Sequence, residues 1–111
     1  MTLPGAERAE VEPDKVREYL LSASHPVGRF KAAFFVALGY SAERWEQLRD
    51  DLLAVARTSD AAAPGGPSPF GVKYEVRATL AAPAGRNADV LTVWIVLDGE
   101  DIPRFVTAFP A

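Results

Sequence analysis

The sequence contains no cysteine and only one histidine, His25. The absence of cysteine excludes a disulfide framework, a thiolate metal site and a cysteine nucleophile, and it fits a cytoplasmic protein. One histidine and scattered carboxylates form no ligand cluster at a plausible spacing. A phosphate-cradling loop is missing too, because Gly65-Gly66 lacks the lysine and the following helix that such a loop needs. We therefore expect no metal ion and no cofactor.

Long hydrophobic runs and a targeting segment are also missing. The longest apolar run, Ala32 to Leu38, is far shorter than the ~20 residues that a membrane-spanning helix needs. The first five residues contain neither a basic segment nor a hydrophobic one, so we expect no signal peptide. The sequence therefore predicts one domain, residues 1–111, with no membrane partner.

An excess of positive charge is absent as well. The chain has 12 basic and 15 acidic residues, which gives a net charge of −3. A nucleic-acid binder that relies on bulk counterion release carries a basic excess. If RNA is a partner, its contacts must come from a local cluster of cations. The acidic balance also suits a basic protein partner.

What the sequence does contain is a helical half. Pro13 is a good helix start, Gly39 is placed to end a helix, and Ser41 is a good N-cap for the next one. The segment 1–12 is mostly small, polar or acidic and reads as a loose lead-in. Three helices are predicted, over residues 14–22, 29–38 and 42–58.

A strand half follows the helices. Residues 59–69 are rich in proline and glycine and predict a connector within the domain. Alternation of polar and apolar residues, and then a run that is apolar on both faces, predict strands over residues 70–80, 89–97 and 104–109. The fold class is therefore α+β, with three N-terminal helices followed by an antiparallel β-meander of three to four strands.

The stretch from His25 to Lys31 concentrates the most chemistry. His25 can act as a general acid or base near neutral pH, because its ordinary pKa is about 6.5. Arg29 and Lys31 follow it at the start of an expected helix, where an anion such as a phosphate is attracted. The alternative is structural: His25 bridges the turn into the helix and Arg29 pairs with an acid.

A second candidate lies on the first predicted strand. Lys73, Glu75 and Arg77 alternate with apolar residues, so they share one face. A glutamate between two cations can act as a general base on a phosphodiester while the cations stabilise the developing charge. An ordinary solvated face with alternating charge has the same pattern.

Residues of the later strands complete the candidate set. Trp94 is either part of the core or a stacking platform for a base if the sheet face is open. Arg104 either binds substrate or lies on an exposed edge. Thr92 and Thr107 either satisfy each other across the sheet or direct a hydroxyl at a site. The predicted substrate-binding residues are thus Lys31, Arg77, Trp94, Arg104 and Thr107, and the predicted catalytic residues are His25, Arg29, Lys73 and Glu75.

The motifs resemble those of a small, uncharacterised bacterial domain family. The resemblance begins with the run His25-Pro26-x-Gly28-Arg29-x-Lys31-Ala32-x-x-Phe35. Further pieces agree in order: Gly39-Tyr40, Trp45 with Leu48, Gly71-Val72-Lys73-Tyr74-Glu75-Val76, Gly85-Arg86, Thr92-Val93-Trp94-Ile95 and Pro103 to Pro110. The resemblance covers most of residues 10–110 and implies no particular function.

The order of helices and then a meander is similar to the superfamily of barnase, colicin nucleases and RelE-type toxins. This similarity is at the level of the fold, and a fold does not determine function. It implies a ribonuclease whose site lies on a concave sheet face, and the matching residues of this chain would be His25, Arg29, Lys73, Glu75 and Thr107.

Two functions stay open from the sequence. The first is a metal-independent endoribonuclease of the toxin type, which acts on RNA and has a cognate antitoxin or immunity partner. The second is a non-catalytic interaction module, such as an immunity or accessory protein. The first requires that His25, Arg29 and Lys73 converge. The second requires a flat or apolar exposed patch with no cleft, and Arg29 held in structural hydrogen bonds.

Overall fold

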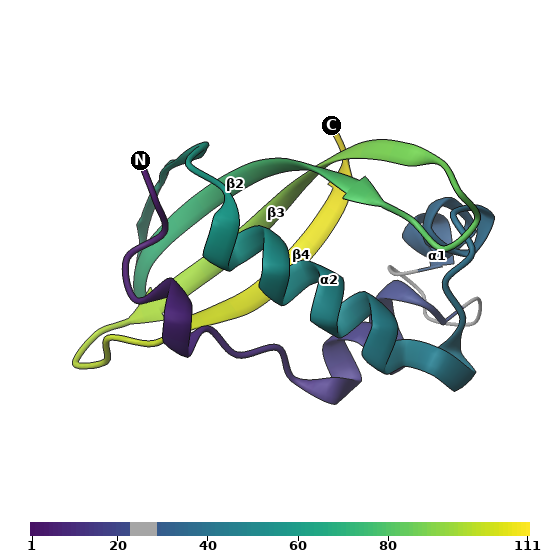
Figure 1. The fold of residues 1–111 in the computed structure, drawn as a ribbon. Coiled ribbons are helices and arrows are strands. Elements are labelled where there is room, and N and C mark those ends of the chain that lie inside the picture. The colour runs from purple at the N-terminus through teal and green to yellow at the C-terminus, as the bar shows by residue number, and fades with distance from the viewer. Residues whose placement is uncertain (23–28) are drawn as a thin grey trace.

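In this computed structural model, the backbone is described for residues 1–22 and 29–111, and side chains for residues 1–22 and 31–111. The described elements, in chain order, are η1 (Ala6–Arg8), η2 (Lys15–Leu20), α1 (Arg29–Ala37), η3 (Ala42–Arg44), α2 (Trp45–Thr58), β1 (Ala62–Ser68), β2 (Gly71–Ala81), β3 (Asn87–Leu97) and β4 (Pro103–Pro110). The α+β class is confirmed, because helices precede an antiparallel sheet (Figure 1).

The helices differ from the three that were predicted. The first is the short π-helix η2, where Leu21 N–H donates to the carbonyl of Val16 at 2.9 Å. The third splits into the 3-10 turn η3 and the helix α2. Ser41 accepts a hydrogen bond from the Arg44 N–H at 3.3 Å, so it caps the 3-10 turn. Only α1 and α2 are regular α-helices among the described residues.

The sheet is a four-stranded meander in the order β1-β2-β3-β4. The prediction of a connector over residues 59–69 was wrong, because most of that segment forms β1 and pairs with β2. An edge strand tolerates proline, since one row of its N–H groups needs no partner. The register shifts between Pro64 and Pro67, which accommodates the two glycines between them.

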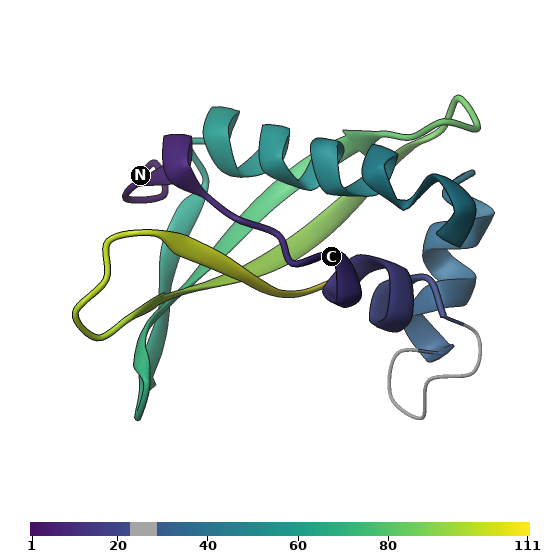
Figure 2. The ribbon, with the colours of Figure 1, turned by 90° about the horizontal axis from the view of Figure 1, so that it is seen from below.

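The hydrophobic core lies between α2 and one face of the sheet (Figures 1 and 2). Leu48 and Leu52 of α2 are fully buried, as are Val76 and Trp94 of the sheet. Burying each such side chain stabilises the fold by about 1.5–3 kcal/mol. We call this side the helix-covered face and the opposite side the outer face.

The prediction of a loose lead-in over residues 1–12 was also wrong. Leu3, Ala6 and Val11 belong to the core. Glu10 forms an isolated parallel bridge with Arg104, so the segment is fastened to β4 by backbone hydrogen bonds. The few apolar residues of this segment are small and widely spaced, so they gave no periodic signal in the sequence. In the structure they pack into the core.

The apolar row of β2 faces the helices only in part. Val76 and Leu80 are buried, whereas Val72 is 48% exposed and Phe70, just before the strand, is 70% exposed. Likewise α1 buries Phe35 but leaves Val36 exposed. The sheet extends beyond the helices at the β1–β2 turn, so no described element covers Phe70 there.

Candidate functional site

The outer face is organised by the cross-strand register. Glu75 of β2 pairs with Val93 of β3, and Val93 pairs with Thr107 of β4. Residues that pair directly across strands point to the same face. Glu75 and Thr107 therefore share a face and lie about two strand spacings apart, ~10 Å. Val93, which is half-buried, forms the floor between them.

Two further rows flank this one. Lys73 lies in the row of Ile95 and Arg104. Arg77 lies in the row of Leu91 and Phe109. The outer face therefore combines an apolar middle strand with charged side chains on β2 and with threonine, phenylalanine and arginine on β4.

The charges on β2 have no partners inside the described part of the chain. Lys73, Glu75 and Arg77 make no ion pair and no side-chain hydrogen bond with any described residue. Gly65 of β1 lies next to Lys73 and Glu75 and has no side chain. A Cβ at this position would crowd them, at 3.3 Å from the Cβ of Lys73 and 3.4 Å from the Cγ of Glu75. A solvated face explains this arrangement, and so does a face that binds an anion.

At the β4 edge of this face the structure forms a cluster that the sequence did not reveal. Lys31 Nζ of α1 donates to the Tyr19 hydroxyl at 2.7 Å and to Thr107 Oγ1 at 2.9 Å. All three side chains are half-buried. We call them the Lys31 cluster. It brings together Lys31 and Thr107, two predicted substrate-binding residues, with Tyr19, which the sequence analysis did not single out.

The Lys31 cluster changes the acidity of Tyr19. Burial alone would raise the pKa of this phenol, but hydrogen bonds from Lys31 and Thr107 lower it. The positive charges of Lys31 and Lys15 act in the same direction, so the net pKa of Tyr19 lies below its ordinary value. The phenolate form is thus favoured by its neighbours.

An aromatic ring lies beside the same ammonium group. Lys31 Nζ is 5.9 Å from the ring centroid of Phe109 and 5.0 Å from that of Tyr19. Phe109 is two residues from Thr107 on β4 and faces the same side. Its half-buried ring offers a stacking surface for a base, a role that the sequence analysis gave to Trp94.

Trp94 itself is a core residue. Its ring is fully buried on the helix-covered face and makes an edge contact with Phe105 at 5.4 Å. Its Nε1–H donates to Thr92 Oγ1 at 2.8 Å, and the Thr92 hydroxyl donates to the carbonyl of Val76 at 2.9 Å. Trp94 therefore presents no ring face to a ligand, and the substrate-binding interpretation of this residue is corrected. Thr92 and Thr107 also do not satisfy each other.

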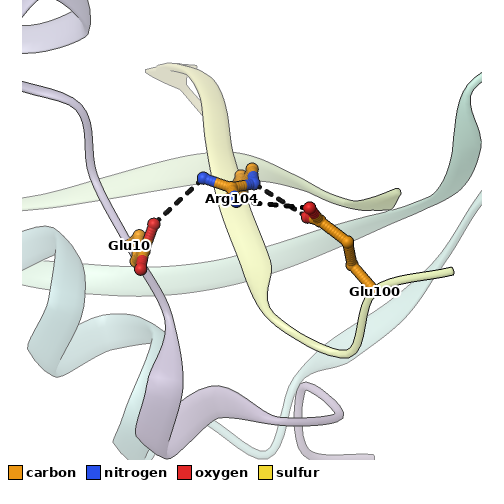
Figure 3. A network of polar contacts seen from close by, with 3 residues as sticks. All are labelled: Glu10, Glu100 and Arg104. Atoms are coloured by element: carbon orange, nitrogen blue, oxygen red, sulfur yellow. Dashed lines mark hydrogen bonds and ion pairs between the residues drawn. The ribbon is translucent and has the colours of Figure 1, made fainter. Parts of the chain in front are cut away.

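Arg104 is held by two carboxylates (Figure 3). Its Nη1 contacts Glu10 and its Nε contacts Glu100, each at 3.0 Å. The hydrogen bond to Glu100 is the main cause that raises the pKa of Arg104, followed by the charges of Glu100 and of Glu10. With both sides of the guanidinium engaged, Arg104 fastens the lead-in to β4, which fits the structural alternative better than substrate binding.

Two of the predicted catalytic residues cannot be placed. His25 lies outside the described residues, and Arg29 begins α1 but its side chain is not described. Their convergence with Lys73 stays a prediction. Among the described residues, no group of three or more His, Cys, Asp and Glu side chains is arranged to hold a metal ion.

An open hollow of about 430 Å³ adjoins the Arg77 end of the outer face. Arg77, Thr79 and Asp89 supply its polar lining, and the Thr79 hydroxyl donates to Asp89 Oδ1 at 2.7 Å. The hollow extends the charged row of β2 toward the C-terminus of the chain.

Comparison with known proteins shows the fold and the family. A search of curated proteins finds no match. Among solved structures, the chain is similar to a chain described as "Contact-dependent growth inhibition toxin - immunity protein complex from Klebsiella pneumoniae 342", with a TM-score of 0.69 and 17% identity. The similarity covers 91% of this chain and 98% of that chain, and at this identity it concerns the fold alone.

Two further findings concern membrane spans and the family. No helix among the described residues is long and apolar enough to cross a membrane. The model of one family matches residues 2–111, nearly the entire sequence, although the family description assigns no function to it. The chain belongs to the family described as "Domain of unknown function (DUF6883)".

Proposed function

We propose that this protein is a toxin-like, metal-independent endoribonuclease that cleaves RNA phosphodiesters in the cytoplasm on the outer face of its sheet. One observation carries the proposal. Glu75 and Thr107 lie on one cross-strand row, flanked by Lys73 and Arg77, whose charges have no partner among the described residues. The fold shared with a chain of a toxin–immunity complex supports a role of this class.

The chemistry uses side chains alone. Glu75 accepts the proton of a ribose 2′-hydroxyl, which then attacks the adjacent phosphorus. Lys73 and Arg77 hold the phosphate and stabilise the negative charge that grows in the transition state. His25 and Arg29 keep the roles inferred from the sequence, as an acid or base and as a phosphate contact.

The first test is cleavage by purified protein. Glu75→Gln keeps the shape of the side chain and removes the base, so we expect cleavage of a mixed RNA substrate to fall by about 100-fold. Lys73→Ala should lower it by a similar factor. Arg57→Ala is the matched control, because Arg57 is an exposed cation on α2 and belongs to the other side of the sheet.

A second test uses inducible expression in bacteria. Wild-type protein should arrest growth with visible RNA cleavage, whereas His25→Ala and Lys73→Ala should not. Absence of both growth arrest and cleavage at high expression would exclude the ribonuclease function for this chain.

A second candidate is a non-catalytic interaction module of the immunity type. It is favoured by the exposed apolar residues Phe70 and Val72 at the β1–β2 turn and by the net charge of −3. The similar solved structure is described as a complex of a toxin with an immunity protein, so its description includes an immunity protein as well as a toxin. This function expects no RNA cleavage by the wild type and a stoichiometric complex with the product of an adjacent gene, which Phe70→Asp abolishes.

A further inference from the structure

We infer that Tyr19 is the general acid of the reaction, the residue that protonates the leaving 5′-oxygen, and that the Lys31 cluster is built to support this step. The inference rests on the proposed ribonuclease function and assigns to the described residues a role that the sequence gave to His25. It follows from the position of the Tyr19 hydroxyl, from its partners and from the spacing of Thr107 and Glu75 across the sheet.

The position of the Tyr19 hydroxyl supports this role. The Tyr19 hydroxyl accepts a hydrogen bond from Lys31 at 2.7 Å, and the same ammonium group donates to Thr107 at 2.9 Å. Thr107 shares a cross-strand row with Glu75, about two strand spacings, ~10 Å, away. That separation leaves room for a phosphate group with one hydrogen bond on either side.

The partners of Tyr19 are those that a general acid needs. A phenol that gives up its proton becomes a phenolate, and a neighbouring ammonium group stabilises that charge. Lys31 makes its two described hydrogen bonds to neutral hydroxyls, so no described carboxylate competes for its charge. Tyr19 therefore combines a proton to donate with a neighbouring cation that stabilises the resulting anion, next to Thr107.

The proposed cleavage consists of two proton transfers and an exchange of one bond at phosphorus. Glu75 takes the proton of the 2′-hydroxyl, and the 2′-oxygen forms a bond to phosphorus. The bond between phosphorus and the 5′-oxygen breaks, and that oxygen takes the proton of Tyr19. The products are a 2′,3′-cyclic phosphate and a 5′-hydroxyl, with Glu75 protonated and Tyr19 a phenolate beside Lys31. Exchange with water restores both groups. Attack and departure occur in line, so the base and the acid belong on opposite sides of the phosphorus.

The test compares two RNA substrates of one sequence. The first has an ordinary 5′-oxygen leaving group. In the second, sulfur replaces that bridging oxygen, and the thiolate leaves without help from an acid. We expect Tyr19→Phe to slow cleavage of the oxygen substrate by 100-fold or more. Cleavage of the sulfur substrate should stay within about threefold of the wild type, because the phenol is then no longer needed.

The outcomes separate the two proposals. Equal loss on both substrates gives Tyr19 a structural role and overturns the inference, while cleavage by the wild type keeps the function. Full activity of Tyr19→Phe on the oxygen substrate overturns it too. If the wild type cleaves neither substrate, both proposals fail. If Tyr19→Phe cleaves the sulfur substrate at the wild-type rate, the variant is folded. His25→Ala in the same assay shows whether His25 is the general acid instead.

Discussion

Lys31 of α1 contacts β4 at Thr107, whereas Arg104 is itself part of β4, and the two cations have different hydrogen-bond partners. Arg104 is held between Glu10 and Glu100, so its charge is compensated by two carboxylates (Figure 3). Lys31 donates to the hydroxyls of Tyr19 and Thr107, which are neutral, so its charge is oriented but not compensated by them.

The two cations differ in how strongly they can attract an anion. A guanidinium with two bound carboxylates has little attraction left for a phosphate, and its contribution is to hold chain segments together. An ammonium fixed by neutral partners keeps its field and needs little rearrangement to meet an anion. Hydrogen-bond partners, more than the presence of a positive residue, therefore distinguish a binding cation from a structural one.

The largest effect should come from removing the Lys31 charge. Lys31→Met keeps most of the apolar length of the side chain and deletes the ammonium, so RNA cleavage should fall by about 100-fold. Arg104→Met is the matched control and should stay within about twofold of the wild type. Equal losses in the two variants would contradict the comparison between these cations.

A smaller effect is expected at Thr107. Thr107→Val is nearly isosteric and removes the hydroxyl that bonds Lys31 and Tyr19, and a hydrogen bond of this kind is worth about 1 kcal/mol. Cleavage should therefore fall by about fivefold to tenfold. Thr79→Val, which removes an exposed hydroxyl bonded to Asp89 on β3, is the control and should change cleavage little. A loss at Thr107 as large as that of Lys31→Met would mean that the threonine does more than orient the lysine.

Arg104 should influence stability instead of activity. Arg104→Gln removes both ion pairs while the backbone bridge between Glu10 and β4 remains. We expect a small decrease of the thermal midpoint in low salt. The difference from the wild type should shrink in 1 M salt, where charges are screened within about 3 Å. A midpoint difference that does not depend on salt would argue against an electrostatic role.

The smallest effect concerns titration of tyrosines, of which the chain has three. The pKa of Tyr19 is lowered, whereas burial and the hydrogen bond to Asp51 raise the pKa of Tyr40. The ultraviolet absorbance of phenolate should show Tyr19 ionising before Tyr40, and the variants Tyr19→Phe and Tyr40→Phe assign the two steps. Lys31→Met should move the early step to higher pH.

The two tyrosines should also affect stability with opposite signs. Between the lowered pKa of Tyr19 and about 10, the unfolded chain holds more protons at this site, so Tyr19 makes the folded state more stable as the pH rises. Above about 10, the unfolded chain loses the Tyr40 proton first, so Tyr40 makes the folded state less stable as the pH rises. Chemical denaturation of Tyr19→Phe and Tyr40→Phe across this range measures both. If Tyr40 increased the free energy of unfolding as the pH rose above about 10, the expected sign would be wrong.

The fold could be predicted where the signal is local. Strict alternation located β2 to within one residue, and the glycine at position 39, with a φ of 99°, ends the α1 region as expected. The strand β1 was missed because its prolines and glycines act as breakers in any local reading. Its pairing with β2 supplies the hydrogen bonds that make it a strand.

The candidate site could be predicted only in part. Lys73, Glu75 and Arg77 share a face because of the strand period, and the structure places them so. For Trp94 and Arg104 the sequence left a structural and a ligand-binding alternative open, since burial and ion pairing depend on what packs against a residue. Tyr19 and Phe109 were missed because no spacing marks a tyrosine of a short helix as a partner of a distant lysine.

The sequence by itself determined the α+β class, the helical and strand halves and the polar row of β2. These follow from side-chain periodicity and from chain breakers, which act over a few residues. Only the tertiary structure decided that Lys31 meets Thr107, 76 residues away, and that Arg104 meets Glu10, 94 residues away. Such meetings depend on strand register and on the packing of η2 and α1 against the edge of β4, and both are set by burial of the whole core.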